Sequence, residues 1–165
     1  MDIHCADTVT PQPEACDPAD QGGDWITTTL PVCSLAAYRK FAAVEELPQW
    51  LPVIHSVRVL SRNHNGRPER VSFLAQLDRA TIGYVLEYEY HETDLSIHFR
   101  TPEDAAIQVS GWARFTPLGH YASLMEYQVR EDRGELPAWD DRSFANHAPS
   151  AVLYHFREYL SRRLH

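Results

Sequence analysis

With 165 residues, the chain has the length of one globular domain and is long enough to bury a substantial core. Hydrophobic residues make up 44% and aromatic residues 11%, a composition typical of a folded protein and not of a disordered one. The formal net charge of −8 opposes binding to a nucleic-acid backbone or to an anionic membrane surface, so we expect no nucleic-acid partner.

No segment has the pattern of a membrane span or of an export signal. The longest apolar stretches are far shorter than the roughly 20 residues that a span requires, so we expect no stable membrane insertion. No charged segment followed by an apolar run is visible near the N-terminus. The sequence therefore predicts a soluble, cytoplasmic protein.

The signatures of classical catalytic, cofactor and metal sites are absent from the sequence. None of the nine histidines stands in HExxH or has the spacing of a zinc ligand set, so no metal site is predicted. GxSxG, GxGxxG and the P-loop pattern do not occur, and we predict no catalytic residue and no cofactor. Cys5, Cys16 and Cys33 form no CxxC pair, and free thiols are expected in a reducing compartment.

The N-terminal part of the chain separates into an arm and the start of a domain. Residues 1–24 are rich in Pro, Asp, Gly and Gln and predict a disordered or loosely ordered arm. The ordered domain is expected over residues 25–165, beginning with a β-branched, alternating strand at 25–32. Ser34 is typical of an N-cap, and apolar residues then recur at helical spacing to Leu47. Pro48 ends that pattern, which predicts one helix followed by a break or by a short second helix.

From residue 53 onward the hydrophobic period changes from 3.6 to 2. Six strands joined by short turns are predicted, at 53–62, 69–78, 81–92, 95–101, 106–119 and 120–132. Tyr84 and Tyr88 share one face of their strand, opposite Glu87 and Glu89, so one side of the sheet is expected to be covered and the other wet. In the strand at 106–119 the alternation leaves open whether Trp112 and Arg114 face inward or outward.

A closing helix follows an acidic loop at 134–148. Pro149 suits the first turn of this helix. Its apolar stripe is predicted to consist of Val152, Leu153, Phe156, Tyr159 and Leu160. A curved sheet that grips one helix leaves space that side chains do not fill, so we expect a cavity lined by aromatic residues. The loops at 62–68 and 134–148 are expected to cover its opening.

Three stretches resemble one known superfamily in their order and spacing. The segment VEELPQWLPVIHSVRVLSR carries Glu46, Pro48, Trp50, Pro52 and Val57 at the matching positions. GWARFTPLG resembles the next-to-last strand, and GELPAW resembles the segment that precedes the closing helix. Over about residues 25–164 the chain is similar to the START-like superfamily of polyketide cyclase–dehydrase and lipid-transport proteins, also named SRPBCC.

The resemblance implies an α+β helix-grip fold: a curved, six- to seven-stranded antiparallel sheet around a long C-terminal helix, with one or two short helices after the first strand. It also implies binding of an apolar ligand of the lipid, quinone or polyketide class. It does not imply one chemistry, because members of the superfamily include carriers, cyclases and regulators.

Ligand-binding residues are predicted on the inner faces of the strands, at the mouth and on the closing helix. The candidates are Trp50, Phe73, Tyr84, Tyr88, Phe99, Trp112, Arg114, Tyr127 and Phe156. Glu87 and Glu126 would suit an acid–base pair if both entered the cavity, although alternation favours the solvated face for each. Non-catalytic binding or carriage is the preferred hypothesis; an aromatase/cyclase or dehydratase is the alternative, and a protein-interaction module is the third. The sequence sets neither the ligand's identity nor the oligomeric state.

Overall fold

The computed structural model describes residues 25–77, 80–106, 108–132 and 149–163. The predicted arm (1–24) and the acidic loop (134–148) lie outside these residues, so the domain boundary at residue 25 stays a prediction. The elements in chain order are β1 (Ile26–Leu30), α1 (Ser34–Ala42), η2 (Val44–Glu46), α2 (Leu47–Trp50), β2 (Ile54–Arg62), β3 (Pro68–Leu77), β4 (Ala80–His91), β5 (Ser96–Arg100), β6 (Gln108–Pro117), β7 (Ser123–Asp132) and α4 (Pro149–Arg162).

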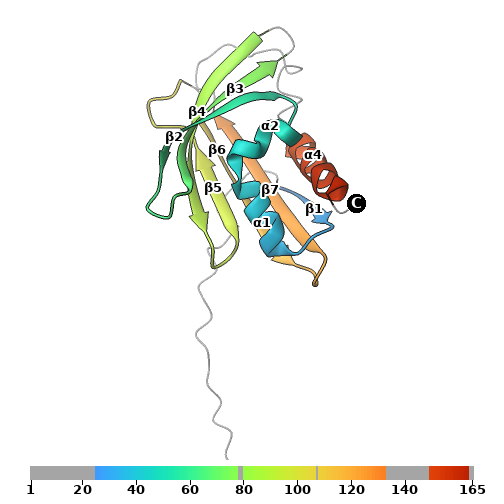
Figure 1. Cartoon of the computed structure of the whole chain (residues 1–165). Coiled ribbons are helices and arrows are strands. Elements are labelled where there is room, and N and C mark those ends of the chain that lie inside the picture. Colours follow the sequence, from blue (N-terminus) through green and yellow to red (C-terminus); the bar gives the residue numbers. More distant parts are fainter. Residues whose placement is uncertain (1–24, 78–79, 107, 133–148, 164–165) are drawn as a thin grey trace, which may run out of the picture.

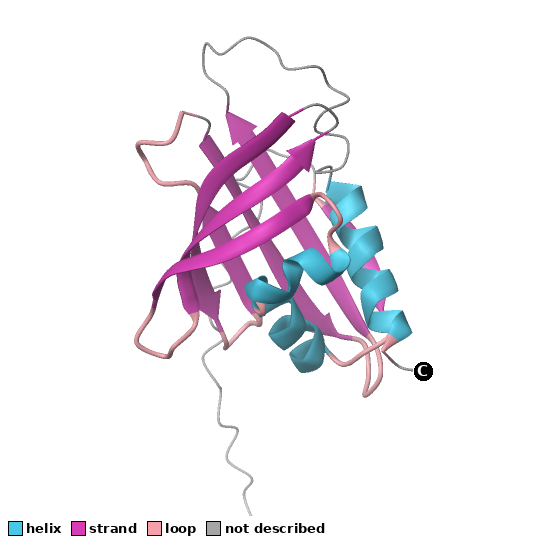
Figure 2. Ribbon diagram, turned by 45° about the horizontal axis from the view of Figure 1, so that its top comes forward, coloured by secondary structure: helices cyan, strands magenta, loops and turns pink. Residues whose placement is uncertain are grey.

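The strands form one antiparallel sheet in the order β1-β7-β6-β5-β4-β3-β2. Strands β2 to β7 make the predicted meander, and β1 adds to its far edge beside β7. The sheet curves around the helices, which lie together on its concave side (Figures 1 and 2). The predicted α+β helix-grip architecture is confirmed.

The segment between β1 and β2 connects the two opposite edges of the sheet. It does so along one end of the concave side, where α1 contacts β6 and α2 contacts β2. The apolar pattern that continues to Leu47 is interrupted at Ala43, whose backbone (φ −78°, ψ 66°) leaves the helical region. Pro48 then lies in the first turn of α2, where the missing N–H costs nothing.

The start of α1 differs from the prediction by one residue. The cap is Cys33, whose extended backbone (φ −64°, ψ 154°) precedes the helix and whose carbonyl accepts the first helical hydrogen bond, from the Ala37 amide at 3.0 Å. Ser34 is therefore the first helical residue and not the N-cap, because the chain leaves the extended conformation one residue earlier than the side-chain pattern indicates.

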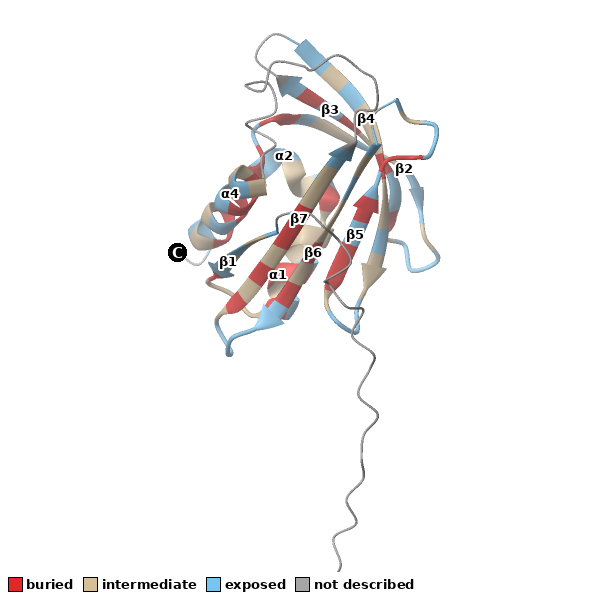
Figure 3. Cartoon of the chain, turned by 180° about the vertical axis from the view of Figure 1, so that it is seen from behind, coloured by how far each residue is buried: buried red, intermediate tan, exposed pale blue. Residues whose placement is uncertain are grey.

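Burial alternates along the strands, as Figure 3 shows. The concave face carries the core, including Val71, Phe73, Ile97, Ala113 and Phe115, each at most 1% exposed. Helix α4 closes this core with the predicted stripe. Its buried residues are Val152, Leu153, Phe156, Tyr159 and Leu160.

Polar side chains attach the β2–β3 hairpin to the neighbouring elements. The Arg67 guanidinium lies over the rings of Tyr38 and Tyr90, 5.3 and 5.2 Å from their centroids. It also donates to the Tyr38 hydroxyl at 3.0 Å and pairs with Glu92 in the β4–β5 turn. The hairpin at 62–68 is thereby attached to α1 and contributes no residue to the cavity described below. The expectation that this hairpin covers the opening of the cavity is therefore corrected.

Candidate ligand-binding cavity

A cavity of about 480 Å³ lies between the concave face of the sheet and the helices. This volume falls within the range of small-molecule sites, roughly 300–1,000 Å³. Its described lining is mostly apolar and aromatic: Phe41, Val44, Leu47, Trp50, Leu51, Ile54, Phe73, Ala75, Ile82, Tyr84, Leu86, Tyr88, Phe99, Thr101, Val109, Tyr127, Val129, Glu131, Pro149 and Val152.

One wall of the cavity is a continuous aromatic surface that crosses from β3 to β7. The rings of Phe73 and Tyr84 stack with their centroids 5.3 Å apart. The ring centroids of Tyr88 and Phe99 lie 6.1 Å apart, and the Phe99 ring stacks on Tyr127 with a centroid distance of 6.1 Å. Alternation on β4 and register between strands place these side chains on one face, so their order follows directly from the meander.

The cavity holds its three phenols in the neutral form. Burial raises the pKa of Tyr84 and of Tyr127 well above the ordinary value. Burial also raises the pKa of Tyr88, and the neighbouring phenols of Tyr84, Tyr90 and Tyr127 raise it further. At physiological pH these groups are hydrogen-bond donors and acceptors and not bases.

Two further polar side chains belong to the described lining. The Thr101 hydroxyl is buried and accepts a hydrogen bond from the Val109 amide at 3.0 Å. Its oxygen is therefore already hydrogen-bonded to the backbone at the strand end. Glu131 lies near the end of β7 and is exposed. It is the one carboxylate among the described lining residues. The interior is therefore apolar, with phenol hydroxyls as its principal polar groups.

Comparison with solved structures gives the fold. A START superfamily protein from Mycobacterium smegmatis matches with a TM-score of 0.72 at 15% identity, over 85% of this chain and 97% of that one. The chain has a START-like helix-grip fold. The Zhui aromatase/cyclase from Streptomyces sp. R1128 matches with a TM-score of 0.64 at 14% identity, over 86% of this chain and 94% of that one.

The di-domain ARO/CYC BexL from the BE-7585A biosynthetic pathway also has this helix-grip fold over part of its length. It matches with a TM-score of 0.66 at 17% identity, over 86% of this chain and 48% of that one. No family model matches the sequence. No curated protein matches it either. Among the described helices, none is both long and apolar enough to cross a bilayer.

The helix-grip fold brings six of the nine sequence-predicted site residues to the cavity: Trp50, Phe73, Tyr84, Tyr88, Phe99 and Tyr127. They come from α2, β3, β4, β5 and β7 and meet because alternation directs each of the strand residues to the concave face. That they contact a ligand stays a prediction.

Trp112 and Arg114 lie on the opposite, outer face of the sheet. The Trp112 Nε1 donates to the Gln128 side chain at 2.9 Å, and the Arg114 Nε donates to Glu126 at 2.7 Å. Placing the two residues at the cavity is therefore corrected: β6 turns Val109, Ala113 and Phe115 inward, so the residues between them face out.

Phe156 belongs to the packed core beside the cavity and not to its lining. The ring is fully buried on α4, with its centroid 5.2 Å from Phe41 and 5.0 Å from Trp50. It packs against Trp50 and is not among the lining residues, so its predicted place among the ligand contacts is corrected. A helix stripe read from sequence separates buried from exposed positions, but it does not separate cavity walls from filled core.

Glu87 and Glu126 both lie on the outer face, as alternation favours, and do not form an acid–base pair in the cavity. Glu87 lies 3.7 Å from the Arg100 Nε on the outer face, and Glu126 pairs with Arg114 there. Within the described residues, no group of three His, Cys, Asp or Glu side chains is placed to hold a metal ion.

At the end of the cavity formed by α1, η2, α2 and the start of β2, sequence reasoning placed Trp50 but missed its neighbours. Phe41, Leu47, Leu51 and Ile54 line the cavity there. The signal was the doubled Leu-Pro in LPQWLPVI, which places apolar side chains on a non-periodic segment beside the sheet edge. Such a segment packs its apolar residues inward without the 3.6-residue period of a helix or the 2-residue period of a strand.

Proposed function

We propose that the chain binds, and thereby carries, a small and mainly apolar molecule of the lipid, quinone or polyketide class. The observation that carries the proposal is the aromatic cavity of about 480 Å³ beneath the sheet. Enclosure of apolar ligand surface contributes roughly 25 cal/mol per Å². The phenols of Tyr84, Tyr88 and Tyr127 would donate hydrogen bonds to a ligand carbonyl or hydroxyl and fix its orientation. The expected cytoplasmic location stays a prediction.

An aromatase/cyclase or dehydratase acting in the same cavity is the second candidate. It draws on one observation: three neutral phenols share one wall of a mostly apolar cavity, where donors stabilise a developing enolate oxygen more strongly than in water. Two structural neighbours are described as aromatase/cyclases. The described lining offers one carboxylate, Glu131, as a base.

A protein-interaction module, the third hypothesis, has less support. Such a module would fill its interior with side chains and present an apolar patch outside. The open space beside the aromatic wall argues for a ligand instead.

Native mass spectrometry of the protein purified from its own host, followed by extraction of any bound molecule, tests the proposal. We expect a mass excess that is lost on unfolding and a released apolar compound. A released compound that is the dehydrated or cyclised form of an added precursor would favour the enzyme. An apo mass that no compound of a hydrophobic library shifts would contradict both hypotheses.

A matched pair of variants assigns the binding to the cavity. Tyr88→Phe removes one buried phenol hydroxyl and should weaken binding of the extracted compound roughly three- to tenfold, the value of one hydrogen bond. Tyr121→Phe removes a hydroxyl from a side chain that is 86% exposed and should leave affinity unchanged. If the two changes altered the affinity equally, the proposed contact between the cavity phenols and the ligand would be wrong.

A further inference from the structure

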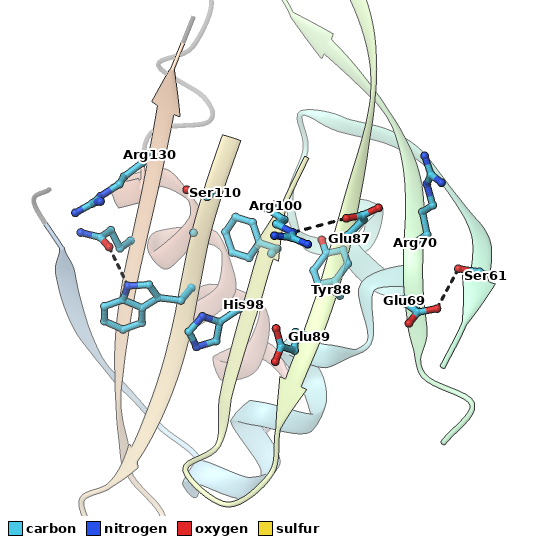
Figure 4. Close-up of a pocket in the computed structure, with 14 residues that line it drawn as sticks. Ser61, Glu69, Arg70, Glu87, Tyr88, Glu89, His98, Arg100, Ser110 and Arg130 are labelled. Atoms are coloured by element: carbon cyan, nitrogen blue, oxygen red, sulfur yellow. Dashed lines mark hydrogen bonds and ion pairs between the residues drawn. The ribbon is translucent and has the colours of Figure 1, made fainter. Parts of the chain in front are cut away.

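The outer face of the sheet carries a transverse row of polar side chains across five strands. Strand register places these residues side by side: Arg70 of β3, Glu87 of β4, Arg100 of β5, Ser110 of β6 and Arg130 of β7. Cross-strand neighbours on one face have Cβ atoms about 4.5–5.5 Å apart, so the row is continuous (Figure 4).

A second row runs parallel to the first and contains Glu89, His98, Trp112 and Gln128. The two rows border a groove of about 840 Å³ on the side of the sheet opposite the cavity. Charge is divided along this groove. Glu69, Glu87 and Glu89 lie toward β3 and β4, whereas the first row between β5 and β7 consists of Arg100, the small Ser110 and Arg130.

Arg130 is the unusual member of the row. Its Nε and Nη2 atoms are shielded from solvent and have no hydrogen-bond acceptor among the described residues. These two adjacent donors form the edge of a guanidinium that binds a carboxylate with two parallel hydrogen bonds. Arg130 as a whole is half-buried, and leaving two shielded donors of its guanidinium without an acceptor is costly, so the position favours an anionic group.

The polypeptide enters the described domain at this same groove. Trp25 packs edge-on against Trp112 with the ring centroids 6.1 Å apart, and the next residue, Ile26, pairs with Tyr127 of β7. Residues 1–24 precede this contact. They contain Asp2, Asp7, Glu14, Asp17, Asp20 and Asp24 and no Lys or Arg.

We propose that the acidic N-terminal arm, residues 1–24, docks in the outer groove over β5–β7 with its carboxylates on Arg130 and Arg100. The reach is sufficient. Asp17 stands eight residues before Trp25, a span of up to about 26–29 Å when extended. Crossing from β7 to β5 requires only about 10 Å, because neighbouring strands lie about 4.8 Å apart. The proposal is independent of what the cavity binds.

A spin label on the arm of the full chain tests the docking. Cys16 carries a nitroxide in a Cys5→Ser, Cys33→Ser background, and the ¹⁵N-labelled protein reports broadening at each amide. We expect the Ser110 and Arg130 amides to lose at least half of their intensity relative to Ser72, which lies on β3 away from this half of the groove. Similar intensities at all three amides would overturn the proposal.

A charge-matched pair of variants identifies the anchor. Arg130→Glu should abolish the broadening, whereas Arg58→Glu makes the same charge change on exposed β2, outside the groove, and should preserve it. Broadening that persists in folded Arg130→Glu would contradict the assignment. If Arg130→Glu fails to fold, the triple variant Asp17→Asn, Asp20→Asn, Asp24→Asn leaves the domain unchanged and must lose the broadening.

Salt and mixing complete the test. Raising the salt from about 0.05 M to about 1 M shortens the Debye length to about 3 Å and should reduce the broadening, because the contacts are ionic. A sample that mixes spin-labelled unenriched protein with unlabelled ¹⁵N protein should show no broadening. Broadening in that mixture would mean that the groove binds the arm of a second copy, which would overturn docking within one chain.

Discussion

Gly111 lies where the neighbouring strand and the Phe99 ring leave no space for a side chain. A Cβ there would overlap the backbone oxygen of Gln128 and lie 2.5 Å from Cζ of Phe99, whose ring covers the glycine and lines the cavity. Gly111→Ala should therefore push the ring toward the cavity and strain the β6–β7 pairing. We expect a loss of about 1–3 kcal/mol in the free energy of unfolding, measured with urea.

Gly83→Ala is the matched control for that change. Gly83 also lies inside a strand, but a Cβ there would meet its nearest neighbour, Cδ2 of Leu74, at an ordinary 3.5 Å. Its unfolding free energy should stay within about 0.5 kcal/mol of the parent or rise, since alanine restricts the unfolded chain. A penalty at Gly83 as large as that at Gly111 would show that close approach is not the cause.

Individual residues also mark how far the sequence predicts the site. On β4 the alternation of tyrosines with Glu87 and Glu89 makes the inner face unambiguous, and Tyr84 and Tyr88 line the cavity as the pattern indicates. On β6 an aromatic ring alternates with small apolar residues. Side-chain size favours the ring for the inner face, whereas polarity favours the small apolar residues. Trp112 lies outside because Ala113 and Phe115 face the core, and its indole N–H there donates a hydrogen bond to Gln128, sixteen residues away. The sequence pattern around Trp112 does not reveal this partner, because Gln128 lies on another strand.

At the scale of elements, α4 is joined to the segment before β2 through one strong hydrogen bond. The Tyr159 hydroxyl donates to Glu46 at 2.7 Å, and Lys40 of α1 lies 3.3 Å from the same carboxylate oxygen. The hydrogen bond from Tyr159, assisted by Lys40, lowers the pKa of Glu46. Burial and the Glu46 carboxylate raise the pKa of Tyr159 to about 12, so the phenol stays protonated between pH 3 and pH 7.

Tyr159→Phe should destabilise the protein in a pH-dependent manner. A carboxylate whose pKa is lowered by folding stabilises the folded state above its unfolded pKa, near 4.5, and loses that contribution as the pH falls through the folded value. We expect a cost of about 1 kcal/mol at pH 7 and a clearly smaller cost at pH 3, from urea titrations at both. Tyr154→Phe, on the exposed side of α4, should cost nothing at either pH. A Tyr159→Phe penalty that is equal at pH 3 and pH 7 would contradict the linkage.

The β2–β3 hairpin provides a second prediction at this scale. Arg67→Met keeps most of the side-chain volume but removes the charge that lies over Tyr38 and Tyr90 and pairs with Glu92. A loss of about 1–2 kcal/mol in unfolding free energy is expected. Hydrogen exchange should also speed up in the hairpin amides first, because that end of the sheet loosens locally. Arg58→Met, an exposed cation of β2, serves as the control and should change neither quantity.

The elements themselves were largely predictable because each has a local signal. The meander, the short second helix after the first and the stripe of α4 all follow from period and turn chemistry. The end of α1 at Ala42, before the apolar pattern finishes at Leu47, does not. The chain there must turn to connect β1 with β2 at opposite edges of the sheet. That requirement arises from the topology of the whole sheet, and it interrupts the helical spacing at Ala43.

For the molecule as a whole, the curved sheet retains empty space that stability alone would remove. Unfilled volume in a core costs about 24 cal/mol per Å³ where the surroundings do not collapse, so a cavity kept open is consistent with selection for a ligand. A larger side chain directed into that space should therefore be accepted by the fold and harmful to binding. Val109 of β6 is suitable because it lines the cavity and is not fully buried.

Val109→Phe should keep the free energy of unfolding within about 1 kcal/mol of the parent or raise it, because the ring occupies existing space. The same change should weaken binding of 8-anilinonaphthalene-1-sulfonate, and of any compound extracted from the protein, at least tenfold. Val85→Phe adds the same ring to the outer face of β4, between Tyr84 and Leu86, and should leave both affinities unchanged. Affinity that survives in Val109→Phe would place the ligand elsewhere. A collapse in stability would instead mean that the space at β6 is already filled, since a site that is empty in the free protein has no packing to disrupt.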